Sequence, residues 1–186
     1  MDSHQISQAI RRRRDLPTSL FKGTFALNQI PSNLTPPFAL VFNSETLSSP
    51  GRHWLALFCP AKGILEVFDT SGNRPMLEAE SLLNLKNFVS TQHGCHLIYN
   101  PNQLQCYLSS VCGEWTVLFL YCRMKGMPFS TFCNHFSKSK LVENDLFVYS
   151  TVHSYFDIPK RKRAFPVFDS RCIQSSLSLQ NVMSAS

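Results

Sequence analysis

Cys112 stands at the expected start of a buried helix, where a thiol can be activated. Residues 115–122 are apolar almost without a break, and Gly126 and Pro128 supply a stop. A thiol at a helix N-terminus feels the positive end of the helix dipole and nearby N–H groups without helical partners. Both effects lower the thiol pKa and favour the reactive thiolate. The alternative is that Cys112 is a small buried hydrophobe.

His53 and Asp69 are expected to meet at one edge of a sheet. His53 starts one predicted strand, Asp69 ends the next, and residues 60–63 between these strands have the length and composition of a hairpin turn. Both side chains then lie close enough to touch across the pair. A carboxylate bound to one imidazole nitrogen orients the ring and stabilises the imidazolium formed when histidine takes a thiol proton. The alternative assigns His53 to a strand end and Asp69 to a turn.

Gln105 lies seven residues before Cys112, in the loop that leads into the predicted helix. There its side-chain amide and the backbone N–H of Cys112 could converge on the oxyanion that forms during acyl transfer. The alternative is an exposed loop residue. Each of the four candidate residues has a structural alternative of this kind. All four residues are much less likely to occur together in this arrangement by chance than any one of them alone.

The remaining pattern predicts an α+β fold, with a sheet packed against the central buried helix. Residues 21–40 are rich in loop-forming residues, although Phe25, Leu27 and Ile30 are spaced to dock on a core. Three consecutive strands are expected to form a meander. The predicted strands are 38–42, 53–58, 64–69 and 95–99, and the predicted helices are 3–14, 75–89, one that starts at 112, 128–136 and 142–156.

Length and composition favour one domain. The 186 residues, 44% of them hydrophobic, can bury one substantial core, which we place at residues 18–157 between a basic segment at 1–17 and a basic, then Ser-rich, disordered tail at 158–186. No apolar segment approaches the roughly 18 residues needed to span a bilayer, and we expect a monomer without membrane association. Seven irregularly spaced cysteines without a CxxC pair favour free thiols in a reducing compartment over disulfides or a metal site.

The net charge of +6 is concentrated in two short runs. These runs contain eight of the 18 basic residues, which leaves ten basic against 12 acidic residues elsewhere. Such runs are typical of solvated segments or of contacts to phosphate, and the second also has the form of a nuclear-import signal. The candidate nucleic-acid contacts are Arg11, Arg12, Arg13, Arg14, Lys160, Arg161, Lys162 and Arg163.

The candidate residues lie in segments that resemble the adenovirus protease, adenain, and its relatives in adenovirus-like viruses and Maverick/Polinton elements. The segments are GRHWLALF at 51–58, LEVFDTSG at 65–72, and Gln105 followed seven residues later by Cys112 and Gly113. Residues 21–25 and 37–41 also fit the N-terminal part of that family, so the resemblance covers about residues 18–156. More distantly, SUMO-specific proteases share the order His, Asp, Gln, Cys.

The resemblance implies a cysteine endopeptidase that cleaves virion precursor proteins after glycine, among small residues, in the host nucleus and the virion. It implies His53 as general base, Asp69 as the group that orients it, Cys112 as nucleophile and Gln105 in the oxyanion hole. It also implies that the sheet and central helix of papain recur with the chain order changed.

Two further partners follow only from the resemblance. The adenoviral enzyme is activated by a short peptide disulfide-bonded to a cysteine near the position of Cys95, which could equally be a buried strand residue. DNA is the second expected activator. Asp69 stands where the adenoviral enzymes carry Glu. Because both side chains are carboxylates, Asp69 can orient His53 in the same way. Glu114 should raise the pKa of the Cys112 thiol unless it points to solvent.

Two other functions remain open at this point. A SUMO or ubiquitin-like isopeptidase would use the same chemistry on a different substrate. A non-enzymatic, nucleic-acid-associated capsid or accessory protein would use the basic runs and merely bury its cysteines.

Overall fold

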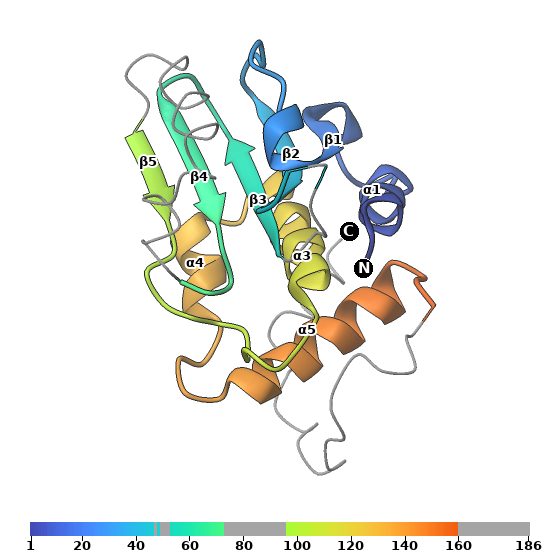
Figure 1. Ribbon diagram of the computed structural model, residues 1–186, viewed down its shortest axis with the longest axis vertical. Helices are drawn as coiled ribbons and strands as arrows, with labels where there is room; N and C mark the ends of the chain where they lie inside the picture. The colour runs from blue at the N-terminus through green and yellow to red at the C-terminus, as the bar shows by residue number, and fades with distance from the viewer. Residues whose placement is uncertain (47, 49–52, 73–95, 160–186) are drawn as a thin grey trace.

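The computed structural model describes residues 1–46, 48, 53–72 and 96–159. They form an α+β fold with a five-stranded mixed sheet (Figure 1). The elements are α1 (Ser3–Arg11), β1 (Phe21–Phe25), β2 (Phe38–Asn43), β3 (Trp54–Cys59), β4 (Ile64–Phe68), β5 (His96–Tyr99), α3 (Cys112–Met124), α4 (Phe129–Asn134) and α5 (Leu141–Tyr155). Two single 3-10 turns, Thr18–Leu20 and Leu27–Gln29, flank β1. The predicted helix at 75–89, Cys95 and the basic run at 160–163 lie outside the described residues.

The strands follow the order β1-β2-β3-β4-β5 across the sheet. Strands β2, β3 and β4 pair antiparallel, so the predicted meander is confirmed, whereas β1 and β5 run parallel to their neighbours at the two edges. All six residues of β2 are buried. Both faces of the central strands are covered, which explains why they read as continuous apolar runs rather than as alternating ones.

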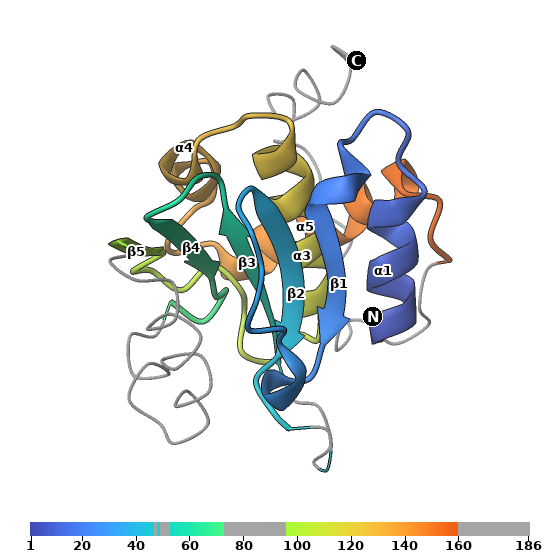
Figure 2. The ribbon, with the colours of Figure 1, turned by 90° about the horizontal axis from the view of Figure 1, so that it is seen from above.

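The two faces of the sheet are covered differently. Helices α3, α4 and α5 lie on one face, and α1 lies beside β1 (Figure 2). The other face packs against the segment between β1 and β2, where Leu27 is buried and Ile30 and Leu34 are partly buried. The expectation that Leu27 and Ile30 dock on a core is therefore confirmed.

Strand β1 was not predicted from the sequence. Its third residue, Gly23, has a φ of 139°, and the register with β2 shifts between Phe21 and Gly23. A bulge of this kind breaks the alternation by which a strand is recognised. The segment is a strand because β2 supplies hydrogen-bonding partners, which local composition does not reveal.

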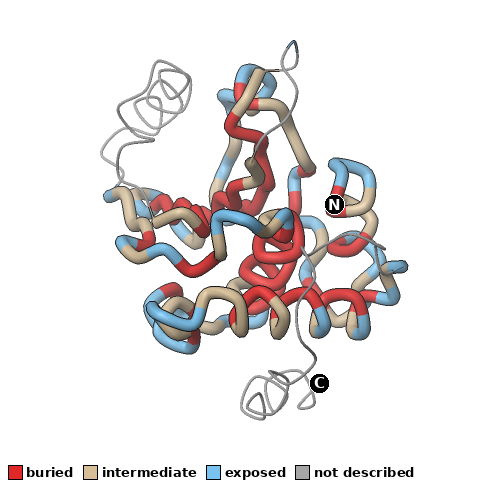
Figure 3. The backbone as a smooth tube through the Cα atoms, turned by 60° about the horizontal axis from the view of Figure 1, so that its bottom comes forward, coloured by how far each residue is buried: buried red, intermediate tan, exposed pale blue. Residues whose placement is uncertain are grey.

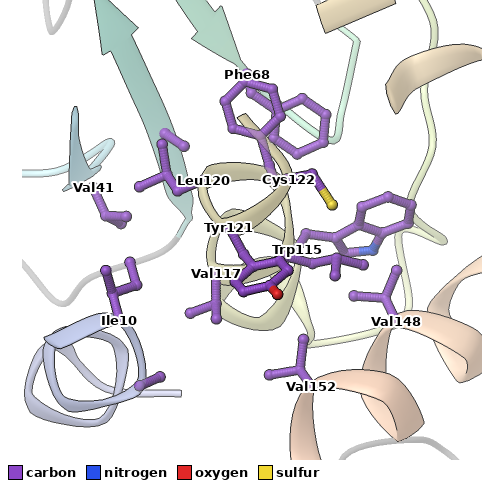
Figure 4. Close-up of a cluster of buried hydrophobic side chains, with 14 of the residues drawn as sticks. Ile10, Val41, Phe68, Trp115, Val117, Leu120, Tyr121, Cys122, Val148 and Val152 are labelled. Atoms are coloured by element: carbon purple, nitrogen blue, oxygen red, sulfur yellow. The ribbon is translucent and has the colours of Figure 1, made fainter. Parts of the chain in front are cut away.

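Helix α3 is the centre of the core and is buried along nearly its whole length (Figure 3). Its residues 113–122 are all buried, as the unbroken apolar run predicted. Phe119 stacks on Phe68 at the end of β4, with ring centroids 4.5 Å apart, and this contact fixes that end of the strand against the helix. Side chains from three other elements surround α3 in Figure 4: Ile10 from α1, Val41 from β2, and Val148 and Val152 from α5.

Helix α5 buries one side only, at residues 144, 145, 148, 149, 152 and 153. This spacing of three and four residues is typical of a helix that packs one face on a core. Among the described residues, no helix combines the length and the apolar character needed to cross a membrane.

Candidate active site

His53 and Asp69 meet at the edge of the β3–β4 pair. His53 directly precedes β3 and Asp69 directly follows β4, and because the strands are antiparallel the two positions lie at the same edge as diagonal neighbours. The Nε2 atom of His53 is 2.8 Å from Oδ1 of Asp69. The hairpin geometry predicted this contact.

Asp69 is held in place by residues that the sequence did not single out. Its Oδ1 accepts hydrogen bonds from the backbone N–H of Ser71, at 2.8 Å, and from the Ser71 hydroxyl, at 2.7 Å. The side chain of Asn100, just after β5, accepts from the Asp69 N–H at 2.9 Å and donates to its carbonyl. An Asn directly after a strand and a Ser two residues after an Asp are weak signals, because both are also common in turns.

Cys112 is the first residue of α3, and its side chain is hydrogen-bonded to His53. The backbone N–H of Trp54 also donates to the sulfur. Since Asp69 occupies Nε2 of His53, Nδ1 is the ring nitrogen available to the thiol. The structure therefore brings the sulfur, the imidazole and the carboxylate into one chain of contacts.

The electrostatics of this chain favour a thiolate beside an imidazolium. Burial alone would raise the pKa of Cys112, but the hydrogen bond and charge of His53 and the Trp54 N–H bring the thiol pKa below its usual value. Burial would likewise lower the pKa of His53, whereas Asp69 and Cys112 raise it to about 10. Burial disfavours ionisation of Asp69 too, yet contact with His53 holds the pKa of that carboxyl below its usual value. The three shifts act in the same direction, toward opposite charges on the sulfur and the ring.

Gln105 is 8% exposed, so it is not an exposed loop residue. Its Oε1 accepts a hydrogen bond from the hydroxyl of Thr70, at 2.6 Å, and Thr70 directly follows Asp69 in the chain. Its Nε2 donates to the carbonyl and hydroxyl oxygens of Ser109, at 3.2 and 3.0 Å. Thr70 thus ties Gln105 to the His53–Asp69 edge, while donation to an oxyanion stays a prediction.

Glu114 is fully buried and does not point to solvent. Its Oε1 lies 3.0 Å from Nε2 of His153, and its Oε2 lies 3.8 Å from the amino nitrogen of Met1. Nδ1 of His153 must carry a proton, because it contacts the carbonyl of Ile158, at 2.9 Å, which can only accept. Nε2 of the same ring faces the carboxylate, so Glu114 has a side-chain partner inside the core. This pairing answers the concern that Glu114 would oppose the thiolate.

The four arginines at 11–14 do not share one role. The guanidinium of Arg13 is 2.8 Å from Asp15, donates to the carbonyl of Tyr155 and lies 4.0 Å from the centre of that ring. Arg12 and Arg14 are exposed. Arg13 is therefore committed to the fold, whereas its two neighbours can reach a phosphate.

The described part of the chain holds no group of three or more His, Cys, Asp or Glu side chains that could bind a metal ion.

Comparison with known proteins gives distant viral relatives. No protein-family model matches the chain. An African swine fever virus protein named as a SUMO-1 cysteine protease is 22% identical over 125 residues, which cover 61% of this chain and 42% of that protein. A protein of Acanthamoeba polyphaga mimivirus, named as a thiol protease, is 30% identical over 94 residues, or 49% of this chain and 31% of that protein. The chain thus spans less than half the length of these curated relatives.

Two solved structures share the fold. A crystal structure of the African swine fever virus protease superposes with a TM-score of 0.51 at 15% identity, over 79% of this chain and 65% of that one. The central domain of an uncharacterized Legionella pneumophila protein superposes with a TM-score of 0.51 at 14% identity, over 84% of this chain and 96% of that one. The sequence relatives support the prediction of a viral cysteine peptidase, and they point to SUMO-type proteases rather than to adenain specifically.

Proposed function

We propose that this protein is a cysteine peptidase with Cys112 as nucleophile, His53 as acid and base, Asp69 as its orienting carboxylate and Gln105 in the oxyanion hole. One observation carries the proposal: the thiol of Cys112 is hydrogen-bonded to an imidazole whose other nitrogen is 2.8 Å from a buried carboxylate. A merely buried cysteine has no need of such partners, which argues against a non-enzymatic capsid or accessory protein.

The proposed reaction begins with attack of the Cys112 thiolate on the carbonyl carbon of the scissile amide. The carbonyl oxygen becomes an oxyanion, which the Gln105 amide and the Cys112 N–H stabilise. The C–N bond then breaks as the His53 imidazolium gives its proton to the leaving amine, and a thioester remains. His53 next takes a proton from water as the water attacks the thioester, the C–S bond breaks, and the acid product leaves while the Cys112 thiolate and the imidazolium are restored. Asp69 keeps the ring oriented and stabilises its charged form throughout.

The proposed architecture is the sheet and central helix of papain with the chain order changed. Its support is that α3 starts at Cys112 and packs on the sheet, while His53 and Asp69 come from strands that precede α3 in the chain. We also propose an activating peptide linked to Cys95, and its sole support is the resemblance of the sequence to adenain.

Two substrate classes fit this chemistry. The resemblance to adenain suggests virion precursor proteins cleaved after glycine, and the alternative is an isopeptidase that acts on SUMO or ubiquitin-like conjugates. The name of the African swine fever virus relatives, SUMO-1 cysteine protease, favours the second class. We therefore place SUMO-type substrates first.

The test compares wild type, Cys112→Ala and the matched control Cys106→Ala. Each is offered SUMO-1 and ubiquitin conjugates and peptides with internal Gly-Gly or Gly-X bonds, with products read by mass spectrometry. We expect Cys112→Ala to abolish cleavage without changing the melting temperature, because a small thiol contributes little packing. Cys106→Ala should stay active. An inactive Cys106→Ala beside an active Cys112→Ala would overturn the assignment of the nucleophile.

A further inference from the structure

The loop that carries Gln105 is held by two consecutive residues of α5. Asn144 is 7% exposed and Asp145 is fully buried. Polar side chains at such positions need hydrogen-bond partners. Their hydrogen-bond partners lie in the loop around Gln105.

Asp145 joins the loop to the nucleophile helix. Its Oδ2 accepts the backbone N–H of Cys106 at 2.9 Å, and its Oδ1 accepts Nε1–H of Trp115, on α3, at 2.8 Å. The hydroxyl of Ser109 donates to the carbonyl of the same Cys106, at 3.0 Å. Burial raises the pKa of Asp145 to about 6, so at neutral pH the side chain is a carboxylate that accepts from the Cys106 and Trp115 N–H groups.

Asn144 holds the other side of Gln105. Its Nδ2 donates to the carbonyl of Leu104, at 3.1 Å, and to the carbonyl of Ser137, at 2.7 Å. Its Oδ1 accepts the backbone N–H of Ser137 at 3.1 Å, so the amide itself is fixed in orientation. The residues immediately before and after Gln105 are thus fastened by neighbouring side chains of a single helix.

The orientation of the Gln105 amide depends on these anchors. The Gln105 Nε2 donates to Ser109, and the Ser109 hydroxyl donates to the carbonyl of Cys106, whose own N–H is held by Asp145. We propose that Asn144 and Asp145 are positioning residues, which fix the backbone on both sides of Gln105 and, through Ser109, aim its amide at the oxyanion. This inference rests on the proposed function. A displacement of about 1 Å in such a donor can cost about a hundredfold in rate, which gives the clamp a measurable effect.

The decisive experiment is a double-mutant cycle of Asp145→Asn with Gln105→Ala. The probe is a peptide that ends in Gly-Gly joined by an amide to a fluorogenic aminocoumarin. Asparagine offers one neutral acceptor oxygen for the two donors, so in either orientation of the amide the Cys106 N–H loses its charged acceptor. We expect kcat of Asp145→Asn to fall by about ten- to a hundredfold with little change in KM. In the Gln105→Ala background, Asp145→Asn should lower kcat no further.

Ser109→Ala is a second variant that interrupts the same relay and should fold, because Ser109 is only partly buried. It should lower kcat several-fold and also be non-additive with Gln105→Ala. Alkylation of Cys112 by iodoacetamide should stay unchanged in Asp145→Asn and Ser109→Ala, because the thiol is held by His53 and Trp54 rather than by the clamp.

Two controls separate positioning from stability. Glu143→Gln changes another carboxylate of α5, which is bound to Lys140 at the surface at 3.1 Å, and should leave kcat unchanged. Trp115→Phe removes one donor from Asp145 and leaves the Cys106 contact, so it should lower the melting temperature and preserve kcat. Additive losses with Gln105→Ala, or an equal fall in kcat in Trp115→Phe, would overturn the clamp. A wild type without activity, or an active Cys112→Ala, would overturn the proposed function itself, and the clamp with it.

Discussion

At each end of α3 an ionisable side chain of the helix pairs with side chains at the sheet. The two ends differ in how many polar atoms of these side chains have hydrogen-bond partners. At the C-terminal end, Arg123 binds Glu66 of β4 through Nε at 2.6 Å and Nη2 at 2.8 Å. Its guanidinium also lies 4.8 Å from the centre of the Phe58 ring and donates to the carbonyl of Met127. At the N-terminal end, Cys112 faces His53 and Asp69. Both ends match the helix dipole, with a cation at the C-terminus and a thiolate at the N-terminus.

Only one of these ends leaves bonding capacity open. The Asp69 Oδ2 is buried and has no hydrogen-bond partner within the described part of the chain, and Cys112 is the nucleophile that we propose. A buried acceptor without a partner costs about 1–3 kcal/mol. The Arg123–Glu66 contact is bidentate, and the guanidinium has further partners in the Phe58 ring and the Met127 carbonyl. Similar charged groups therefore stabilise the fold where their hydrogen bonds are satisfied, and stay available to the proposed reaction where they are not.

The largest expected effect is that of Asp69→Asn, at the N-terminal end. It should lower kcat by about 10³- to 10⁴-fold with folding intact, because an amide cannot stabilise the imidazolium and can select the wrong tautomer. The carboxylate helps to hold the pKa of His53 at about 10. Without it that pKa falls, and the alkaline limb of the kcat/KM profile should move to lower pH.

The profile of kcat/KM against pH for wild type and Asp69→Asn, measured with the fluorogenic Gly-Gly amide, checks both parts of this prediction. Glu66→Gln is the matched control, because it removes the next carboxylate in β4. Near-wild-type turnover of Asp69→Asn, together with an inactive Glu66→Gln, would show that the reaction depends on Glu66, at the C-terminal end of α3. The contrast drawn between the two ends would then be wrong.

A second prediction concerns Arg123→Ala, at the C-terminal end. It leaves Glu66 buried without its partner, so the free energy of unfolding should fall by about 3–5 kcal/mol. Activity per folded molecule should be preserved, because no atom of the pair reaches Cys112. Urea unfolding together with active-site titration by iodoacetamide measures the two quantities separately.

Lys125→Ala is the control for Arg123→Ala. Lys125 belongs to the same end of α3, but its Nζ is 3.7 Å from Asp15 and the side chain is 24% exposed. A pair of this kind contributes less than about 1 kcal/mol. If both variants lose the same free energy of unfolding, the loss comes from any change at this end of the helix and not from breaking the buried pair.

The sequence predicted the parts of the site that local geometry determines. A short turn between two apolar strands brings their far ends to one edge of the sheet, so the order of residues alone places His53 and Asp69 close together. The apolar run after Cys112 likewise predicted where α3 begins. The fold class followed from the same periodicities, whereas β1 was missed because its strand character comes from pairing with β2.

The parts that could not be predicted depend on contacts between distant residues. Asn100 reaches Asp69 across 31 positions, and Asp145 reaches Cys106 across 39. Glu114 seemed misplaced beside a thiolate because its partner, His153, lies 39 positions later. A polar residue inside an apolar helical pattern signals that a buried partner exists, but the sequence does not say which one.

The smallest expected effect concerns DNA, which we propose as a partner of the two basic runs. The first run begins beside the closed end of α3, where Arg13 binds Asp15, and Asp15 in turn accepts from the Tyr121 hydroxyl at 2.9 Å. Arg12 and Arg14 are exposed. If each of these two exposed arginines meets a phosphate, changing both to Ser should reduce the slope of log affinity against log salt by about 1.8, at about 0.9 per contact on duplex DNA.

Arg13→Ser should do the reverse, lowering the melting temperature and leaving the salt slope unchanged. Fluorescent duplex DNA titrated at several salt concentrations gives the slopes, and thermal unfolding of the same samples gives the stabilities, with residues 160–163 left intact throughout. A reduced slope in Arg13→Ser alone would mean that this arginine leaves its aromatic and carboxylate contacts to bind phosphate. The closed end of α3 would then open on binding, and the contrast between the two ends would hold only for the free protein.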